Sequence, residues 1–206
     1  KIRTNDGVEG FGLATSYTDA TPILKVLQSG ITERLIGANP LSPEKIYEDL
    51  FSLTWQREAH ERGWGKEALI RISAAIDVAC WDIIGKISGL PLYQIFGGYR
   101  DKIPYYVTCA YYRDGKDMKE LRDEISELKE QGHTGFKAKV GGLSLAEDIA
   151  RLELVREIIG KDSKLMVDVN RAWSLETAIE AVKALEPLEP YWLEEPLRWV
   201  DDRRQL

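Results

Sequence analysis

Residues 164–170 read Lys-Leu-Met-Val-Asp-Val-Asn, a short apolar run that ends in polar side chains. A second run of this kind, Trp-Leu-Glu-Glu-Pro, occupies residues 192–196. Alternation with a period of two predicts a β-strand in which Asp168 and Asn170 share one face. Glu194 ends the second strand in the same way. Two carboxylates at the ends of successive strands suit a hard divalent cation such as Mg²⁺. On spacing alone, acids that only mark strand ends or cap the next helix explain the pattern equally well.

The overall composition is that of an ordinary globular protein. The 206 residues are 44% hydrophobic and 30% charged. A net charge of −6 without a long basic run argues against nucleic acid or a membrane as a partner. No apolar run reaches transmembrane length. Cys80 and Cys109 each lie in an apolar segment, which predicts buried free thiols and a cytoplasmic location.

Residues 1–100 are predicted to form an α+β domain that is incomplete at its N-terminus, because the chain opens directly on a strand. Asp6-Gly7 between two strand-like runs is a hairpin signal. The periodicity predicts helices over residues 21–36 with an interruption near Gly30, from Ser42-Pro43-Glu44 onward, and over 69–87, with a loop over 55–65. The last helix carries one apolar stripe, formed by Leu69, Ile72, Ile76, Ala79, Ile83 and Ile87.

Residues 101–206 alternate between strand and helix patterns. Strands are predicted at 104–110, 136–140, 164–170 and 191–194, and helices at 117–131, 144–159 and 174–185. Such βα units, repeating about every 30 residues, predict a parallel sheet with right-handed crossovers. No glycine-rich dinucleotide fingerprint or Walker A motif follows any strand.

Functional residues at the C-terminal ends of successive strands are typical of a TIM-like (β/α) barrel, which has eight βα units. The fold class we predict is therefore α/β. Residues 1–100 are a capping domain, and residues 101–206 hold the first four βα units of a barrel. On this interpretation the chain is the front portion of a longer protein.

Lys137 and Lys139 lie two apart on a predicted strand, so both side chains point to the same face. Two neighbouring ammonium groups lower each other's pKa, and a lysine pushed toward neutrality can act as a base. The other lysine can hold an anionic substrate. A surface strand with two solvated lysines is the alternative. Lysines beside carboxylates that hold Mg²⁺ suit removal of the proton α to a carboxylate, since metal and cation charge stabilise the developing enediolate.

The chain resembles the mandelate racemase/muconate lactonizing enzyme family of the enolase superfamily. Residues 74–86, followed by Pro91-Leu92 and Phe96-Gly97, closely follow that family's first signature, with small departures at Ile72 and Cys80. A second signature is matched by Leu165, Asp168, Asn170, Ala178, Leu185, Leu193, Glu194, Glu195 and Pro196. Lys137-Ala138-Lys139 is similar to the family's Lys-x-Lys, and the 26 positions from Asp168 to Glu194 match its metal-ligand interval.

The resemblance implies a role for each matching residue. Asp168 and Glu194 are implied as the first two Mg²⁺ ligands, and Lys139 as the base or acid on one face of the substrate. Lys137 is implied to bind the substrate carboxylate, and Asn170 to lie near the substrate or the metal. The third acidic ligand and the acid or base on the opposite face are expected beyond the last residue of the chain.

The same resemblance makes residues 55–65 a possible specificity loop. His60 and Trp64, together with Arg57 and Arg62, are then candidates for contacts with a polyhydroxy acid, although an exposed polar loop without this role fits equally well.

The leading functional hypothesis is Mg²⁺-dependent dehydration of a sugar acid through an enediolate. Racemisation or epimerisation of a 2-hydroxy acid or related carboxylate is the alternative, and cycloisomerisation of the muconate lactonizing type is the third. The expected partner is a small-molecule carboxylate, and the full-length protein is expected to be a homo-oligomer.

Overall fold

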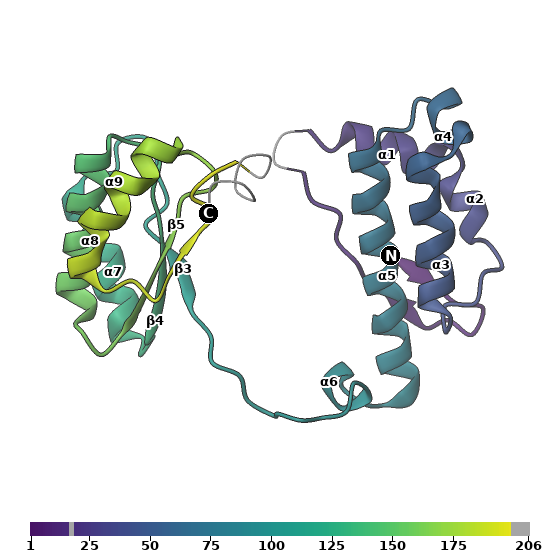
Figure 1. Ribbon diagram of the computed structural model, residues 1–206. Helices are drawn as coiled ribbons and strands as arrows, with labels where there is room; N and C mark the ends of the chain where they lie inside the picture. The colour runs from purple at the N-terminus through teal and green to yellow at the C-terminus, as the bar shows by residue number, and fades with distance from the viewer. Residues whose placement is uncertain (17–18, 199–206) are drawn as a thin grey trace. The chain divides into compact units, whose positions relative to one another are not determined.

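The computed structural model describes residues 1–16 and 19–198. The chain divides into two compact units, Lys1–Lys102 and Ile103–Leu206, and each is described by itself (Figure 1). Within the described ranges, no helix combines the length and the apolarity that crossing a membrane requires. Cys80 and Cys109 are both buried and free, as predicted.

The first unit combines a hairpin with helices. Strands β1 (Ile2–Arg3) and β2 (Glu9–Gly10) pair antiparallel, which confirms the predicted hairpin. Gly7, in the turn, has a φ of 85° that favours glycine. The helical elements are α1 (Thr21–Val26), η1 (Leu27–Ile31), α2 (Thr32–Leu35), α3 (Pro43–Phe51), η2 (Ser52–Trp55), α4 (Arg57–Glu61), α5 (Lys66–Ser88) and α6 (Leu92–Ile95).

For the helices of this unit, one prediction is confirmed and another is wrong. The predicted interruption is confirmed, because Gly30 has a φ of 137° inside the π-helical segment η1. The prediction of a loop over residues 55–65 is wrong, because α4 occupies Arg57–Glu61. An ion pair of 2.7 Å between Arg57 and Glu61, spaced i,i+4, supports this single short helix.

Helix α5 runs through the core of the first unit. Five positions of its predicted stripe are buried, namely Leu69, Ile72, Ile76, Ala79 and Ile83. Ile87, the sixth, is 53% exposed, so its assignment to the core is wrong. It lies in the last turn, close to the C-terminal end of α5 at Ser88.

The second unit is a parallel α/β structure. Its elements are β3 (Val107–Cys109), α7 (Met118–Glu130), β4 (Gly135–Lys139), α8 (Leu145–Ile159), β5 (Lys164–Asp168), α9 (Leu175–Leu185), η3 (Glu186–Leu188) and β6 (Trp192–Glu194). The strands lie in the order β3-β4-β5-β6, and every pair is parallel, which confirms the predicted βα units. Asp117 accepts a hydrogen bond from the backbone N–H of Glu120, and Ser144 and Glu147 form the predicted capping box of α8.

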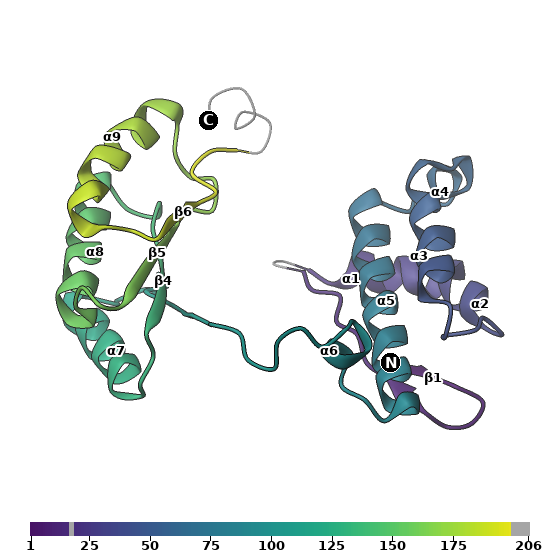
Figure 2. The ribbon, with the colours of Figure 1, turned by 60° about the horizontal axis from the view of Figure 1, so that its bottom comes forward.

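Helices α7, α8 and α9 lie along one face of this sheet (Figure 2). The side chains of Phe136, Ala138, Leu165 and Val167 are fully buried in the core between sheet and helices. Because side chains alternate along a strand, the residues between them point to the opposite face. That second face therefore receives Lys137, Lys139 and Asp168.

The close approach of residue 12 to α5 gives a test of the first unit. A Cβ on Gly12 would lie 1.7 Å from the carbonyl oxygen of Ala75, so backbone would have to move. Gly12→Ala should lower the free energy of unfolding by about 1–3 kcal/mol. Gly65→Ala is the matched control, because a Cβ there meets no atom within 4 Å and φ is −67°. Urea unfolding followed by circular dichroism measures both, and equal midpoints would contradict the packing described.

Candidate active site

The strand register places three functional side chains in one row. Lys139 on β4 pairs with Asp168 on β5, and Asp168 pairs with Glu194 on β6. All three residues end their strands. Since the strands are parallel, these ends meet at the C-terminal edge of the sheet, where functional residues of α/β sheets gather.

The row and Lys137 form one cluster of alternating charges. Lys139 Nζ lies 2.6 Å from Asp168 Oδ2 and donates to Asn170 Oδ1 at 2.7 Å. Lys137 Nζ lies 2.9 Å from Glu194 Oε1 and 3.1 Å from Asp168 Oδ2. Two ammonium groups and two carboxylates thus compensate one another. The structure brings together five of the predicted site residues: Lys137, Lys139, Asp168, Asn170 and Glu194.

Burial makes this compensation necessary. The side chains of Asp168, Lys137 and Lys139 are only 1%, 11% and 15% exposed. Burial raises the pKa of the Asp168 carboxyl, but the hydrogen bonds from Lys139 and Lys137 outweigh burial and hold its pKa below the usual value. Asp168 is therefore ionised at neutral pH.

The expectation of a lowered lysine pKa is wrong for Lys137 in this state of the protein. Burial acts to lower the pKa of Lys137, but hydrogen bonds to Glu194 and Asp168 outweigh it, and the pKa lies above the usual range. Repulsion between the two lysines was expected to dominate. The carboxylates of Glu194 and Asp168 lie 2.9 and 3.1 Å from the Lys137 ammonium group, and their hydrogen bonds decide the direction of the shift.

Asn170 lies just past the end of β5, which is shorter than the predicted strand over residues 164–170. Its φ is 49°, in the left-handed region that asparagine tolerates better than most residues. Its backbone N–H donates to Asp168 Oδ1 at 3.1 Å. The turn after β5 therefore directs both the N–H and the side-chain oxygen of Asn170 toward the charge cluster.

Three aromatic residues that lie beside the cluster were not predicted from the sequence. Lys137 Nζ lies 5.5 Å from the ring centroid of Tyr106, and Lys139 Nζ lies 5.7 Å from that of Tyr111. Trp192 donates from Nε1 to Glu194 Oε2 at 3.2 Å. Trp192 and Glu194 are two apart on β6, so the period-two rule could have placed this indole on the face of the site.

His60 and Trp64 belong to the first unit. Trp64 is only 6% exposed, packs in that unit's core and donates from Nε1 to Ser29 Oγ at 2.7 Å. Its indole thus has a structural role, which argues against direct contact with a substrate. His60 is exposed on α4, and a substrate contact there stays a prediction.

The donor set of the cluster fits a divalent cation. Lys137 Nζ already places a positive charge within 3.1 Å of oxygens from both Asp168 and Glu194. Across residues 1–16 and 19–198, no group of three or more His, Cys, Asp or Glu side chains could hold a metal. The described residues therefore offer two carboxylates, and other oxygen ligands such as water or substrate must complete the six or more that Mg²⁺ or a similar ion requires.

Two larger cavities are not lined by the charged residues of the cluster. One of about 710 Å³ is in the first unit, lined by Ser29, Arg62 and Trp64 among others. Another of about 820 Å³ lies between the loops after β3 and β4, and its wall includes Tyr111 and Arg151. Neither is lined by the four charged residues of the cluster. The candidate site is therefore defined by the charged side chains of the cluster and not by a cavity.

Parallel βα units with lysines and carboxylates at the strand ends define an α/β protein with an enzyme-like site. Two family models match the chain: "Mandelate racemase / muconate lactonizing enzyme, N-terminal domain" over residues 1–97 and "Enolase C-terminal domain-like" over residues 120–206. The chain belongs to the mandelate racemase/muconate lactonizing enzyme family of the enolase superfamily.

Three relatives illustrate the similarity. Arabinonate dehydratase of Saccharolobus solfataricus is 31% identical over 96% of this chain and 52% of its own length. L-talarate/galactarate dehydratase of Salmonella typhimurium is 35% identical over 98% and 49%. Its crystal structure with Mg and L-lyxarohydroxamate matches with a TM-score of 0.80 and 33% identity, covering 95% of this chain and 48% of that one. N-succinyl-L-Arg/Lys racemase of Bacillus cereus is 30% identical over 96% and 51%. The chain thus spans about half the length of these relatives.

Asp168→Asn tests the electrostatics of the cluster. In chelator-treated protein at pH 7 it should lower the free energy of unfolding by about 3–5 kcal/mol, because two buried ammonium groups lose a carboxylate. The folded-state pKa of Asp168 is lowered, so its stabilisation is present above the unfolded pKa and is lost as pH falls through the folded pKa. The deficit should therefore shrink toward pH 3.

Urea unfolding across pH measures this deficit. Asp123→Asn, which breaks an exposed pair with Lys119, is the control and should stay near wild-type stability. A deficit that is constant from pH 7 to 3 would contradict the assignment.

Proposed function

We propose that the protein abstracts the proton α to a carboxylate in a Mg²⁺-dependent reaction, and that it dehydrates a sugar acid. We also propose that the second unit is the front half of a TIM-like barrel and the first unit its capping domain. The observation that carries the proposal is the alternating cluster of two lysines and two carboxylates at the ends of adjacent parallel strands. Relatives named as sugar-acid dehydratases support the choice of reaction.

Asp168 and Glu194 would hold the metal through carboxylate oxygens. Bound Mg²⁺ supplies positive charge that stabilises the negative charge developing on the substrate carboxylate. The oxygens that would hold the cation are the ones that Lys137 contacts, so Lys137 would have to release them when the metal is bound. Lys137 is then available to hold an anionic group of the substrate.

Lys139 is proposed to move the proton. In its neutral form, Nζ accepts the C2 proton, and the C2–H electron pair passes into the enediolate. Asn170 Oδ1, 2.7 Å from Nζ, orients the amine. The enediolate electron pair then forms a C2–C3 double bond as the C3–O bond breaks, and the hydroxyl group leaves as water with a proton from a general acid. The resulting enol gains a proton at C3 and loses its O–H proton, which gives a 2-keto-3-deoxy acid.

Racemisation or epimerisation is the second candidate, because the same half-site serves it and a relative of similar identity is a racemase. Cycloisomerisation is the third, and other relatives carry that name. The three reactions share proton removal and differ in its sequel. A small carboxylate substrate, a homo-oligomeric full-length protein and a cytoplasmic location belong to the same proposal.

The reaction class is tested by incubating the full-length protein with a panel of acid sugars, Mg²⁺ and D₂O. Dehydration predicts 2-keto-3-deoxy products, detected as semicarbazones. Exchange of the C2 proton without such products would indicate the racemase alternative. Turnover that continues undiminished after EDTA treatment would refute the metal dependence.

Lys139→Ala tests the proposed base. It removes the proton acceptor, so exchange of the α-proton by this face should fall by about a hundredfold or more, with substrate binding largely kept. Lys164→Ala is the matched control, because Lys164 is an exposed strand lysine at the opposite end of β5. NMR of deuterium incorporation measures both variants. Normal exchange in Lys139→Ala would leave that lysine with an electrostatic role only.

A further inference from the structure

A second polar group of the second unit is buried outside the charge cluster. Asp148 and Arg151 lie three apart in the first turns of α8, so they share one face of the helix. They are only 1% and 8% exposed. Buried charges are costly unless they are paired and hydrogen-bonded, so the contacts of this pair show what it is built to hold.

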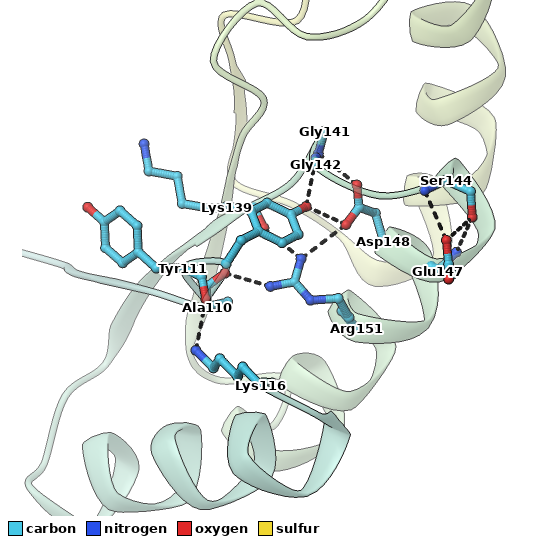
Figure 3. Close-up of polar contacts among 11 residues, drawn as sticks. Ala110, Tyr111, Lys116, Lys139, Gly141, Gly142, Ser144, Glu147, Asp148 and Arg151 are labelled. Carbon is cyan, nitrogen blue, oxygen red and sulfur yellow. Dashed lines mark hydrogen bonds and ion pairs between the residues drawn. The ribbon is translucent and has the colours of Figure 1, made fainter. Parts of the chain in front are cut away.

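Asp148 anchors the loop that follows β4. Its Oδ2 accepts the backbone N–H of Gly141 at 2.7 Å, and its Oδ1 accepts from Arg151 Nη1 at 3.0 Å and from the Tyr112 hydroxyl. The Tyr112 hydroxyl in turn accepts the backbone N–H of Gly142 at 3.0 Å. Both glycine N–H groups of this loop are therefore fixed by side chains, one by the buried Asp148 carboxylate and the other by the Tyr112 hydroxyl (Figure 3).

Arg151 joins the ends of two strands. Its Nη1 donates to the carbonyl oxygen of Lys139 at 3.2 Å, and its Nη2 donates to that of Ala110 at 2.6 Å (Figure 3). Its guanidinium carbon lies 4.2 Å from the ring centroid of Tyr112. Ala110 follows β3 directly and has a φ of 56°, a strained value for a residue other than glycine. The contact holds that backbone in place.

We infer that Tyr112, Asp148 and Arg151 form a clamp that positions the backbone of Lys139, and with it the amine that carries the proton. The inference rests on the proposed function. The clamp holds the Lys139 carbonyl and the N–H groups of residues 141 and 142, and no contact of its members reaches the Lys139 amine. A misplacement of about 1 Å at a reacting group can cost roughly a hundredfold in rate, so backbone support at this point acts on catalysis.

The test substitutes Arg151→Met, which keeps a long stem and removes every donor. We expect kcat for α-proton exchange to fall by about tenfold to a hundredfold, while KM stays near its wild-type value. Arg151→Lys restores a single ammonium donor and should recover part of kcat. Tyr112→Phe keeps the ring beneath the guanidinium and removes only the hydroxyl group, so it serves if Arg151→Met fails to fold, and it too should lower kcat.

Arg156→Met is the matched control from the same helix. Arg156 also fastens backbone carbonyls, those of Leu188, Gly160, Ser163 and Glu189, at the opposite end of α8. The Arg156→Met variant should lose stability, as Arg151→Met does, but its kcat should stay at the wild-type value. Unchanged kcat in both Arg151→Met and Tyr112→Phe would overturn the inference, and so would equal losses of kcat in Arg151→Met and Arg156→Met.

Failure of the proposed function would give a different result from failure of the clamp. If wild-type protein exchanges the α-proton of no acid sugar, the proposed reaction fails, and the clamp is then judged by crystal structures. The inference predicts that Lys139 Nζ and Asp168 Oδ2, 2.6 Å apart in the wild type, separate in Arg151→Met. An unmoved Lys139 in that variant would overturn the clamp by itself.

Discussion

The second unit depends on one electrostatic constraint: two buried ammonium groups and two carboxylates must share a small volume without net charge. Lys137 bridges Glu194 and Asp168, and Lys139 pairs with Asp168. Removing any one member leaves an uncompensated charge in a region of low dielectric. Two carboxylates that hold an ammonium group can also hold a metal cation of the same sign. The ammonium group can in turn hold a substrate anion.

Backbone structure brings these four side chains together. The parallel register aligns Lys139, Asp168 and Glu194 across three strands, and the apolar residues between them are buried under α7, α8 and α9. A slip of one residue would send every functional side chain into that core. Packing on the helix side of the sheet therefore fixes the positions of the charged side chains on the other side. The buried contacts of Asp148 and Arg151 add a further restraint where β4 ends.

Much of the fold and part of the site could be predicted from periodicity. The period-two pattern placed Lys137 and Lys139 on one face of their strand, and the structure shows both lysines within 3.1 Å of Asp168. Capping signals located α7 and α8, because Asp117 and Ser144 make the local hydrogen bonds that those signals describe. These are interactions between neighbours in sequence, so a sequence pattern carries them.

Features that depend on distant residues were missed. Trp64 looked like an exposed loop residue, but its indole packs in the first unit's core against partners that the local sequence does not specify. Tyr111 and Arg151 reach β4 from other elements, across distances that no periodicity encodes. The predicted direction of the Lys137 pKa shift was wrong for the same reason, because Glu194, 57 positions away, and Asp168 together raise that pKa. The roles of Lys137 and Arg151 in catalysis stay a proposal.

The central claim is that Asp168 and Glu194 bind a divalent cation in place of the lysine ammonium group. Isothermal titration of Mg²⁺ into metal-free protein tests it most directly, with Asp168→Asn, Glu194→Gln and, as the neighbouring control, Glu195→Gln, whose side chain lies 3.6 Å from Arg171. The account predicts binding that is roughly tenfold or more weaker in the first two variants and unchanged in Glu195→Gln. Wild-type affinity in both Asp168→Asn and Glu194→Gln would contradict it.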